Sequence, residues 1–236
     1  MSGQRVGVVG DERLVGPVEA LGCEAITIGT PPFESVPLVV GAGEEAIVDL
    51  ARARIDAPVL PVAVDGGFAS VPFGSVEAAL EYVLGSDPET DRHSIVEASG
   101  AFDPIPALFD IALMAAEPAR ISEFSVHTDD DLVSRFRADG VVVSTPAGSH
   151  GYNRAAGGPI VESRTDVVSV VPIAPFAMAA DRWVLPIDSV SFSVERDETP
   201  VELLVDGRRE GIVEPGTRVD ISHVGGLETY VLPQFE

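Results

Sequence analysis

The spacing of apolar residues changes near residue 93, and this change constrains the fold more than any other feature of the sequence. Before that point, short apolar stretches alternate with stretches of helical spacing. Beyond it, short segments rich in Val, Ile and Ser recur between Asp-Gly, Pro-Gly and Gly-Gly turns. The sequence therefore predicts an α/β domain with an open parallel sheet, followed by an all-β domain.

The same pattern gives the expected boundaries. We predict an α/β domain over 1–92, an all-β domain over 93–226, and a terminal segment, 227–236, whose strand (229–235) returns to the first domain. Polar residues 85–92 are predicted to be a linker. In the first domain we expect strands at 5–9, 25–28, up to 40 and 59–64, and helices at 12–21, 44–54 and 75–84. In the second we expect strands at 107–114, 120–127, 140–144, 167–171, 190–194, 201–205 and 218–223.

The charge balance is strongly acidic. The chain has 38 acidic residues against 15 basic ones, all of them arginine, and a net charge of −23. This composition is typical of proteins from a high-salt cytoplasm, where charges are screened over about 3 Å at molar salt. The alternative is an acidic protein from a cytoplasm of ordinary salt concentration. Either way, the balance disfavours nucleic acid and anionic membranes as partners.

Several simpler features narrow the class of protein. The sequence contains no run of eighteen apolar residues, so no membrane span is predicted. The N-terminus does not have the pattern of a secretory signal. The single cysteine, Cys23, excludes an intramolecular disulfide. We therefore expect a cytoplasmic protein. The histidines lack metal-ligand spacing, so zinc is not expected, and 129–131 are interpreted as a hairpin turn.

Residues 139–161, DGVVVSTPAGSHGYNRAAGGPIV, carry the strongest functional signal. An apolar strand runs into a loop of small residues and turn-formers, which exposes backbone N–H groups to a ligand. The loop is predicted to bind a nucleotide or its phosphates through Ser144, Thr145, Gly148 and Ser149.

The order of residues in this run closely resembles the second signature of NAD kinases, DGxxxSTPTGSTAYxxxxGGPI. The resemblance extends to the Asp-Gly pair at 206–207 and to VVPIAPFAMAADRWVLP at 170–186. It implies a two-domain fold with the active site between the domains. It also implies that ATP or polyphosphate phosphorylates the 2′-hydroxyl of NAD to give NADP, with Mg²⁺ assisting. A homodimer or homotetramer is expected on the same ground.

The resemblance also assigns binding residues by position. Asp110 stands where the family has the acid of an Asn-Glu pair, and Phe68 matches the Phe of its GxxGF turn. The residues that would line the NAD pocket are Asp139, His150, Gly151, Tyr152, Ala155 and Ala174. Arg154 and Arg182 are phosphate candidates, because they lie in or beside matched segments.

The first family signature, GGDGT, is degenerate here. Residues 41–45, Gly-Ala-Gly-Glu-Glu, occupy its places, so no aspartate stands at the catalytic position. Either Glu44 or Glu45 supplies the missing carboxylate, or the chain keeps the nucleotide pocket without the chemistry. Acids in a first helical turn also have a purely structural role, because they complement the helix dipole. Phe109, His150 and Phe176 replace polar or hydroxyl residues of the family pattern.

The sequence thus supports two hypotheses. The first is an NAD kinase-like phosphotransferase of haloarchaeal type, with Glu44 or Glu45 as the catalytic acid. The second is a non-catalytic homologue that binds NAD(P) or an adenine nucleotide, in a regulatory role or as a partner subunit. A lipid or sugar kinase that shares GGDGT is disfavoured, because those enzymes do not carry the second signature in this form.

Overall fold

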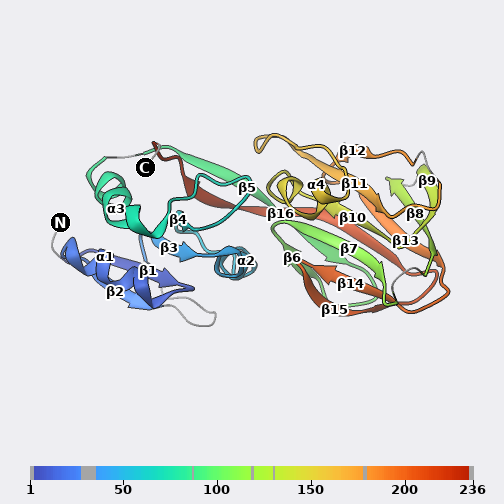
Figure 1. The fold of residues 1–236 in the computed structure, drawn as a ribbon, viewed down its shortest axis with the longest axis horizontal. Coiled ribbons are helices and arrows are strands. Elements are labelled where there is room, and N and C mark those ends of the chain that lie inside the picture. Colours follow the sequence, from blue (N-terminus) through green and yellow to red (C-terminus); the bar gives the residue numbers. More distant parts are fainter. Residues whose placement is uncertain are drawn as a thin grey trace. The chain divides into compact units, whose positions relative to one another are not determined.

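The protein forms two compact units, shown in the computed structural model in Figure 1. The structure describes residues 3–27, 36–86, 88–117, 120–129, 131–177 and 180–233. Residues 1–93 and 226–236 make up the first unit, and residues 94–225 make up the second. The final strand, β16 (Arg218–Tyr230), begins in the second unit and ends in the first.

The first unit contains a parallel sheet in the order β2-β1-β3-β4. Its strands are β1 (Arg5–Val9), β2 (Glu24–Thr27), β3 (Val39–Ala42) and β4 (Val59–Val62). Beyond β4, Thr229 of β16 pairs in parallel with Val59. Strands β3 and β4 are buried along their whole length, as expected for a parallel sheet with helices on both faces.

Helices cover both faces of this sheet. They are η1 (Glu12–Leu14), α1 (Val15–Ala20), α2 (Glu44–Arg52), η2 (Phe73–Ser75) and α3 (Val76–Gly85). Val40 and Ala42 pack in one cluster with residues of α1 and α3. Gly41 points to the opposite face, where a Cβ would lie 2.9 Å from Ile47 Cδ1 and 3.1 Å from Leu50 Cδ1 of α2. The alternation along β3 therefore places α2 opposite α1 and α3.

The second unit is built from two antiparallel sheets. One contains β13, β8 and β9 beside the first part of β16, with β5 and β6 attached; the other has the order β12-β11-β10-β7-β14-β15. The strands are β5 (Thr90–Ser99), β6 (Ile105–Ala107), β7 (Asp110–Ala115), β8 (Ser122–Thr128), β9 (Asp131–Ala138), β10 (Gly140–Ser144), β11 (Val167–Ile173), β12 (Trp183–Pro186), β13 (Val190–Arg196), β14 (Val201–Val205) and β15 (Arg208–Val213).

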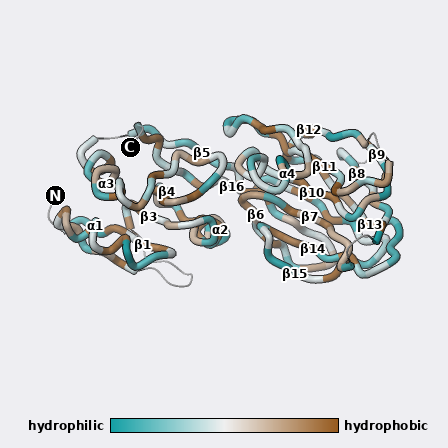
Figure 2. Tube along the Cα trace, viewed as in Figure 1, coloured by the Kyte–Doolittle hydropathy of each residue, from teal (hydrophilic) through white to brown (hydrophobic). Residues whose placement is uncertain are grey.

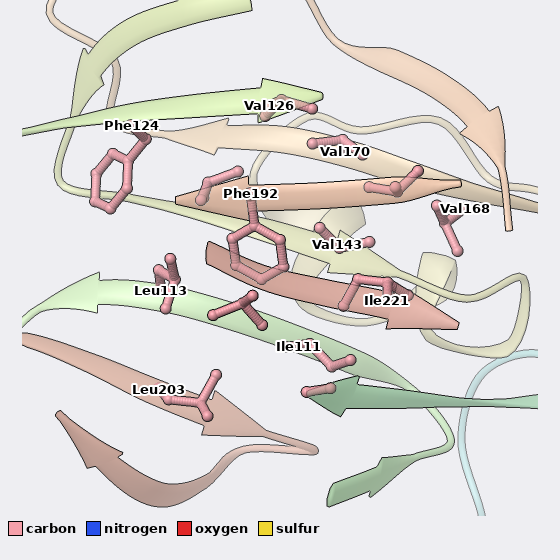
Figure 3. Close-up of a cluster of buried hydrophobic side chains, with 14 of the residues drawn as sticks. Ile111, Leu113, Phe124, Val126, Val143, Val168, Val170, Phe192, Leu203 and Ile221 are labelled. Carbon is pink, nitrogen blue, oxygen red and sulfur yellow. The ribbon is translucent and has the colours of Figure 1, made fainter. Parts of the chain in front are cut away.

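The core of the second unit lies between these sheets. Phe124 and Phe192 come from β8 and β13, and Leu113, Val143 and Leu203 come from the other sheet (Figure 3). Each is almost completely buried, and burying one such side chain contributes about 1.5–3 kcal/mol. Hydrophobic residues of β7, β10 and β14 form the brown stretches of Figure 2. Ala112, Val142 and Val171 form a second, smaller buried cluster, against which Ala156 of the loop after β10 packs.

The predicted fold class, an α/β domain plus an all-β domain, is confirmed. Details differ. Strand β5 begins at Thr90, inside the predicted linker, and the predicted strand 107–114 is interrupted between β6 and β7. The predicted strand 218–223 and the first two residues of the predicted strand 229–235 belong to one continuous strand, β16, whereas residues 231–233 are in no strand. The sequence prediction missed β5, and it also missed β9, β12 and β15, which carry many charged or exposed residues. Ile28, Asp130 and residues 234–235 of the predicted elements lie outside the described residues.

None of the helices in the described ranges is long and apolar enough to cross a membrane.

Candidate functional site

The loop after β10 is held by hydrogen bonds to the segment before β7. The backbone N–H of Thr145 donates to the carbonyl of Phe109 (2.9 Å), and its hydroxyl donates to the carbonyl of Leu108 (2.6 Å). The same hydroxyl accepts from the N–H of Gly148 (3.2 Å). Thr145 is buried, so these bonds fix the start of the loop and of the 3₁₀ turn η3 (Ala147–His150).

Gly148 is required by space. A Cβ at this position would lie 1.9 Å from the carbonyl oxygen of Phe109, a distance that no side chain tolerates. Ser149 is equally internal: its hydroxyl donates to the carbonyl of Pro146 (2.7 Å) and accepts from the N–H of Val161 (3.0 Å). The side chains of Thr145 and Ser149 therefore support the loop itself. Any contact that these residues make with a ligand would involve the backbone.

Asn153 lies at the centre of the loop, in the short helix α4 (Tyr152–Ala155). Its amide Nδ2 donates to the carbonyls of Ser149 (3.0 Å) and Pro159 (2.7 Å), and its Oδ1 accepts from the hydroxyl of Ser169 (2.7 Å). A Cβ on Gly158 would lie 2.3 Å from that Oδ1. The sequence prediction missed Asn153, although its amide has two N–H donors and an acceptor and is therefore able to bridge several loop segments.

Asp110, Asp139 and Tyr152 form a polar cluster beside the loop. Burial raises the pKa of the Tyr152 phenol, and the nearby carboxylates of Asp110 and Asp139 raise it further. The phenol oxygen also lies 3.9 Å from the sulfur of Met114, which is paired with Gly140. Tyr152 is nevertheless 42% exposed, so an aromatic face and two acids are accessible at one place.

Ala174 belongs to the same region. The N–H of Asp139 donates to the carbonyl of Ile173 (3.0 Å), which places Ala174 immediately beyond Asp139. Ala174 has a φ of 44°, an uncommon conformation for a residue with a side chain. His150 ends η3, and Gly151 and Ala155 are exposed in the following turn, where the N–H of Ala155 donates to the carbonyl of Gly151 (3.2 Å).

Asp206 binds the backbone at the start of β7, the strand that begins with Asp110. Its carboxylate accepts from the N–H groups of Leu108 (3.0 Å), Phe109 (2.7 Å) and Asp110 (3.2 Å). Asp206 and Gly207 both have positive φ and form the tight turn between β14 and β15. The Asp-Gly pair noted in the sequence is therefore a hairpin turn that also fixes the backbone before β7.

Ser144 has a different environment. It ends β10 opposite Asp110, is completely buried, and its hydroxyl has no hydrogen-bond partner among the described residues.

The remaining predicted residues lie in the first unit. Glu44 and Glu45 are exposed in the first turn of α2, directly after Gly43, whose φ is 82°. Phe68 is buried against the ring of His93, with ring centroids 4.3 Å apart. The imidazole Nε2 of His93 lies 2.9 Å from the hydroxyl of Thr229, and burial lowers the pKa of His93.

The described part of the chain contains no group of three or more His, Cys, Asp or Glu side chains placed to hold a metal ion.

Comparisons with known proteins point to one family. Residues 109–229 match the family model described as the ATP-NAD kinase C-terminal domain. The chain is 32% identical over 203 residues to an NAD kinase of Methanosarcina mazei, covering 84% of this chain and 70% of the relative. It is 31% identical over 196 residues to an NAD kinase of Methanosarcina barkeri, covering 81% of this chain and 71% of the relative.

Two solved structures share the fold. The crystal structure of yeast NADH kinase complexed with NADH superposes with a TM-score of 0.83 at 19% identity, covering 99% of this chain and 84% of that one. The crystal structure of an NAD kinase from Archaeoglobus fulgidus in complex with ATP gives a TM-score of 0.82 at 23% identity, covering 97% and 94%.

Proposed function

Because the chain belongs to the NAD kinase family, we propose that it makes NADP by transferring a phosphoryl group from ATP or polyphosphate to NAD. The observation that carries this proposal is the preserved loop after β10, whose internal hydrogen bonds keep it rigid beside Asp110, Asp139 and Tyr152. A loop of small residues admits a ligand close to the main chain, and the two carboxylates accept hydrogen bonds from the hydroxyl and amino groups of a nucleoside.

The binding residues follow from this proposal. Tyr152 offers an exposed aromatic face, and Asp110 and Asp139 lie near its phenol. Ser144 brings an unpaired buried hydroxyl to the same strand end. His150, Gly151, Ala155 and Ala174 complete the proposed pocket of the second unit. Phe68, in the first unit, stays a proposed binding residue.

The proposed catalytic carboxylate is Glu44 or Glu45. In phosphoryl transfer, the 2′-hydroxyl oxygen of NAD bonds to the terminal phosphorus, the bond from that phosphorus to the bridging oxygen breaks, and the hydroxyl proton passes to a base. Both glutamates are exposed in the first turn of α2.

A resident metal does not fit the described residues, since no three possible ligands come together. Mg²⁺ commonly binds through substrate phosphates with one or two carboxylates. In our proposal the ion therefore arrives with the phosphates as part of the substrate, and no step is assigned to it.

One observation favours a second function, binding of NAD(P) or an adenine nucleotide without turnover. Gly43 stands at the place of the family's catalytic aspartate, and the two acids after it complement the dipole of α2. Two negative charges at a helix N-terminus also repel phosphate groups. A regulatory protein or a partner subunit of an active kinase would have no need of the missing aspartate.

An assay of NADP formation with NAD, Mg²⁺ and either ATP or polyphosphate separates the two functions. We expect turnover that falls about 10²- to 10⁴-fold in whichever of Glu44→Gln and Glu45→Gln removes the base. The exposed Glu81→Gln on α3 is the matched control and should leave turnover unchanged. Nucleotide binding by calorimetry without any NADP would contradict the kinase proposal and support the second function. The absence of both binding and turnover would exclude both.

The acid-rich composition supports a further proposal, that the protein works in a high-salt cytoplasm, and the family resemblance alone supports a homodimer or homotetramer. With 38 acids and 15 arginines, self-repulsion at low salt destabilises the compact state. The midpoint of thermal unfolding should therefore rise between 0.1 and about 2 M KCl as screening shortens. Sedimentation at high salt measures the oligomer. A midpoint independent of KCl would contradict the high-salt proposal.

A further inference from the structure

Three arginines of this acidic chain stand apart from the others. Most described arginines form an ion pair with an acid, as Arg135 does with Glu195 (2.8 Å) and Arg209 with Glu202 (2.7 Å). Within the described residues, the side chains of Arg154, Arg182 and Arg196 have neither an ion pair nor a hydrogen bond. With 38 acids in the chain, a guanidinium without a carboxylate beside it needs an explanation.

Two of these arginines, Arg154 and Arg182, lie at the same turn. The guanidinium of Arg182 lies on Gly157: a Cβ built there would be 3.0 Å from a terminal nitrogen and 3.5 Å from both Cζ and Nε. Arg154 is in α4, and its carbonyl accepts the N–H of Gly157 (2.9 Å). Arg154 therefore belongs to the turn on which Arg182 rests. Arg196 is at the end of β13, away from this turn in the sequence.

The turn is rigid. Gly157 has a φ of 83°, which favours glycine, and the N–H of Gly158 donates to the carbonyl of Asn153 (2.8 Å). Asn153 in turn bridges Ser149, Pro159 and Ser169 from the buried side. The backbone N–H groups of Gly157 and Gly158 are both used inside the protein. An anion at this turn would therefore be held by the arginine side chains and not by the main chain.

We propose that Arg182 and Arg154 form an anion subsite at the Gly157–Gly158 turn that takes the diphosphate group of a dinucleotide. Arg182 is exposed, and its guanidinium, beside Gly157, carries N–H groups that match the oxygens of a phosphate. The chain has a net negative charge, so an anion is attracted only where cations such as these two arginines lie without a neighbouring acid. The assignment of the ligand rests on the proposed function, whereas the subsite itself rests on the two arginines.

The test uses inorganic pyrophosphate as the probe, titrated into the full chain by calorimetry at one fixed KCl concentration. Arg182→Gln and Arg154→Gln should each weaken binding about tenfold. Arg196→Gln removes the same charge from another unpaired arginine and should leave the affinity unchanged. Gly157→Ala is a second variant, because its methyl group would displace the Arg182 guanidinium and should reproduce the loss. The thermal midpoint of each variant shows whether it is folded.

The outcomes separate this subsite from the kinase proposal. Arginine-dependent pyrophosphate binding in a protein that binds no NAD would keep the subsite and remove the proposed ligand. An Arg196→Gln variant that weakens binding as much as Arg182→Gln would show a diffuse effect of charge, and the subsite would be wrong. It would also be wrong if wild-type protein binds no pyrophosphate, or binds it as tightly without Arg182 and Arg154.

Discussion

The turn after β3 and the loop after β10 differ in how strongly the rest of the chain constrains them. In the loop, Gly148 has no room for a methyl group, and Asn153 satisfies three polar partners. In the turn, no described atom lies within 4 Å of a Cβ on Gly43, and Glu44 and Glu45 are exposed. The loop cannot change sequence without a cost in folding, whereas the turn can. Preservation of the loop therefore reports on the architecture of the second unit at least as much as on catalysis.

The largest test of this difference compares two glycines. Gly148→Ala would place a methyl group 1.9 Å from the Phe109 carbonyl and should lower the free energy of unfolding by about 3 kcal/mol or more. Gly43→Ala meets no neighbour and has only its φ of 82° to overcome, a cost of about 1–2 kcal/mol. Urea unfolding measures both. Equal losses would break the comparison.

Asp206 tests whether the constraint on the loop extends to the neighbouring hairpin. Asp206→Ala leaves three backbone N–H groups without their carboxylate acceptor, and we expect a loss of about 2 kcal/mol in the free energy of unfolding. Affinity for NAD should fall as well, because Asp110 is no longer held. Gly207 provides the control: Gly207→Asn keeps the positive φ accessible and should cost far less. Unchanged stability in Asp206→Ala would mean that these three hydrogen bonds do not stabilise the fold.

A smaller effect on the free energy of unfolding is expected in the first unit, from the titration of His93. Burial lowers the pKa of His93 in the folded protein, so the folded state favours the neutral ring. The stability this provides is complete above the unfolded pKa of about 6.5 and is lost as the pH falls below it toward the folded pKa. One proton changes the free energy of unfolding by at most about 1.4 kcal/mol per pH unit. Thermal melts at pH 5–8 should show this slope in wild type and not in His93→Gln.

The smallest effect is expected at Ser144. Its buried hydroxyl has no hydrogen-bond partner in the part of the chain that the structure describes, so Ser144→Ala should leave the free energy of unfolding unchanged or raise it by less than about 1 kcal/mol. A weaker affinity for NAD in a variant of unchanged stability would show that the ligand uses this hydroxyl. A clear loss of stability would reveal a bound water or other partner and place Ser144 with the constrained residues of the loop.

The fold class was predictable because the apolar spacing differs between the two units. The apolar segments 5–9 and 201–205 were predicted as strands with the bounds that the structure has. Strand β9 was missed because residues such as Asp131, Arg135 and Arg137 contradict strand propensity, which matters less at a solvated edge. Pairing between distant segments decides such strands, and one sequence does not show it.

The position of the site was predictable from the sequence, but the role of each side chain in it was not. The sequence indicated the loop from Ser144 to Pro159, yet it could not show that Thr145 and Ser149 direct their hydroxyls to internal carbonyls. Nor could it show that Asp206 holds Leu108, Phe109 and Asp110 from 96 to 98 residues away. These roles depend on tertiary contacts. The predicted ligand contacts of the loop and of Glu44 and Glu45 stay predictions.

The course of β16 has a consequence for how the protein is made. The strand that pairs with β4 in the first unit is made only after the whole second unit has been synthesised, because Thr229, which pairs with Val59, follows that unit in the sequence. Until then β4 has an unpaired edge, which is a template for pairing with other chains. Nascent or C-terminally truncated chains should therefore depend on chaperones, even though the N-terminal sequence contains nearly all of its own sheet.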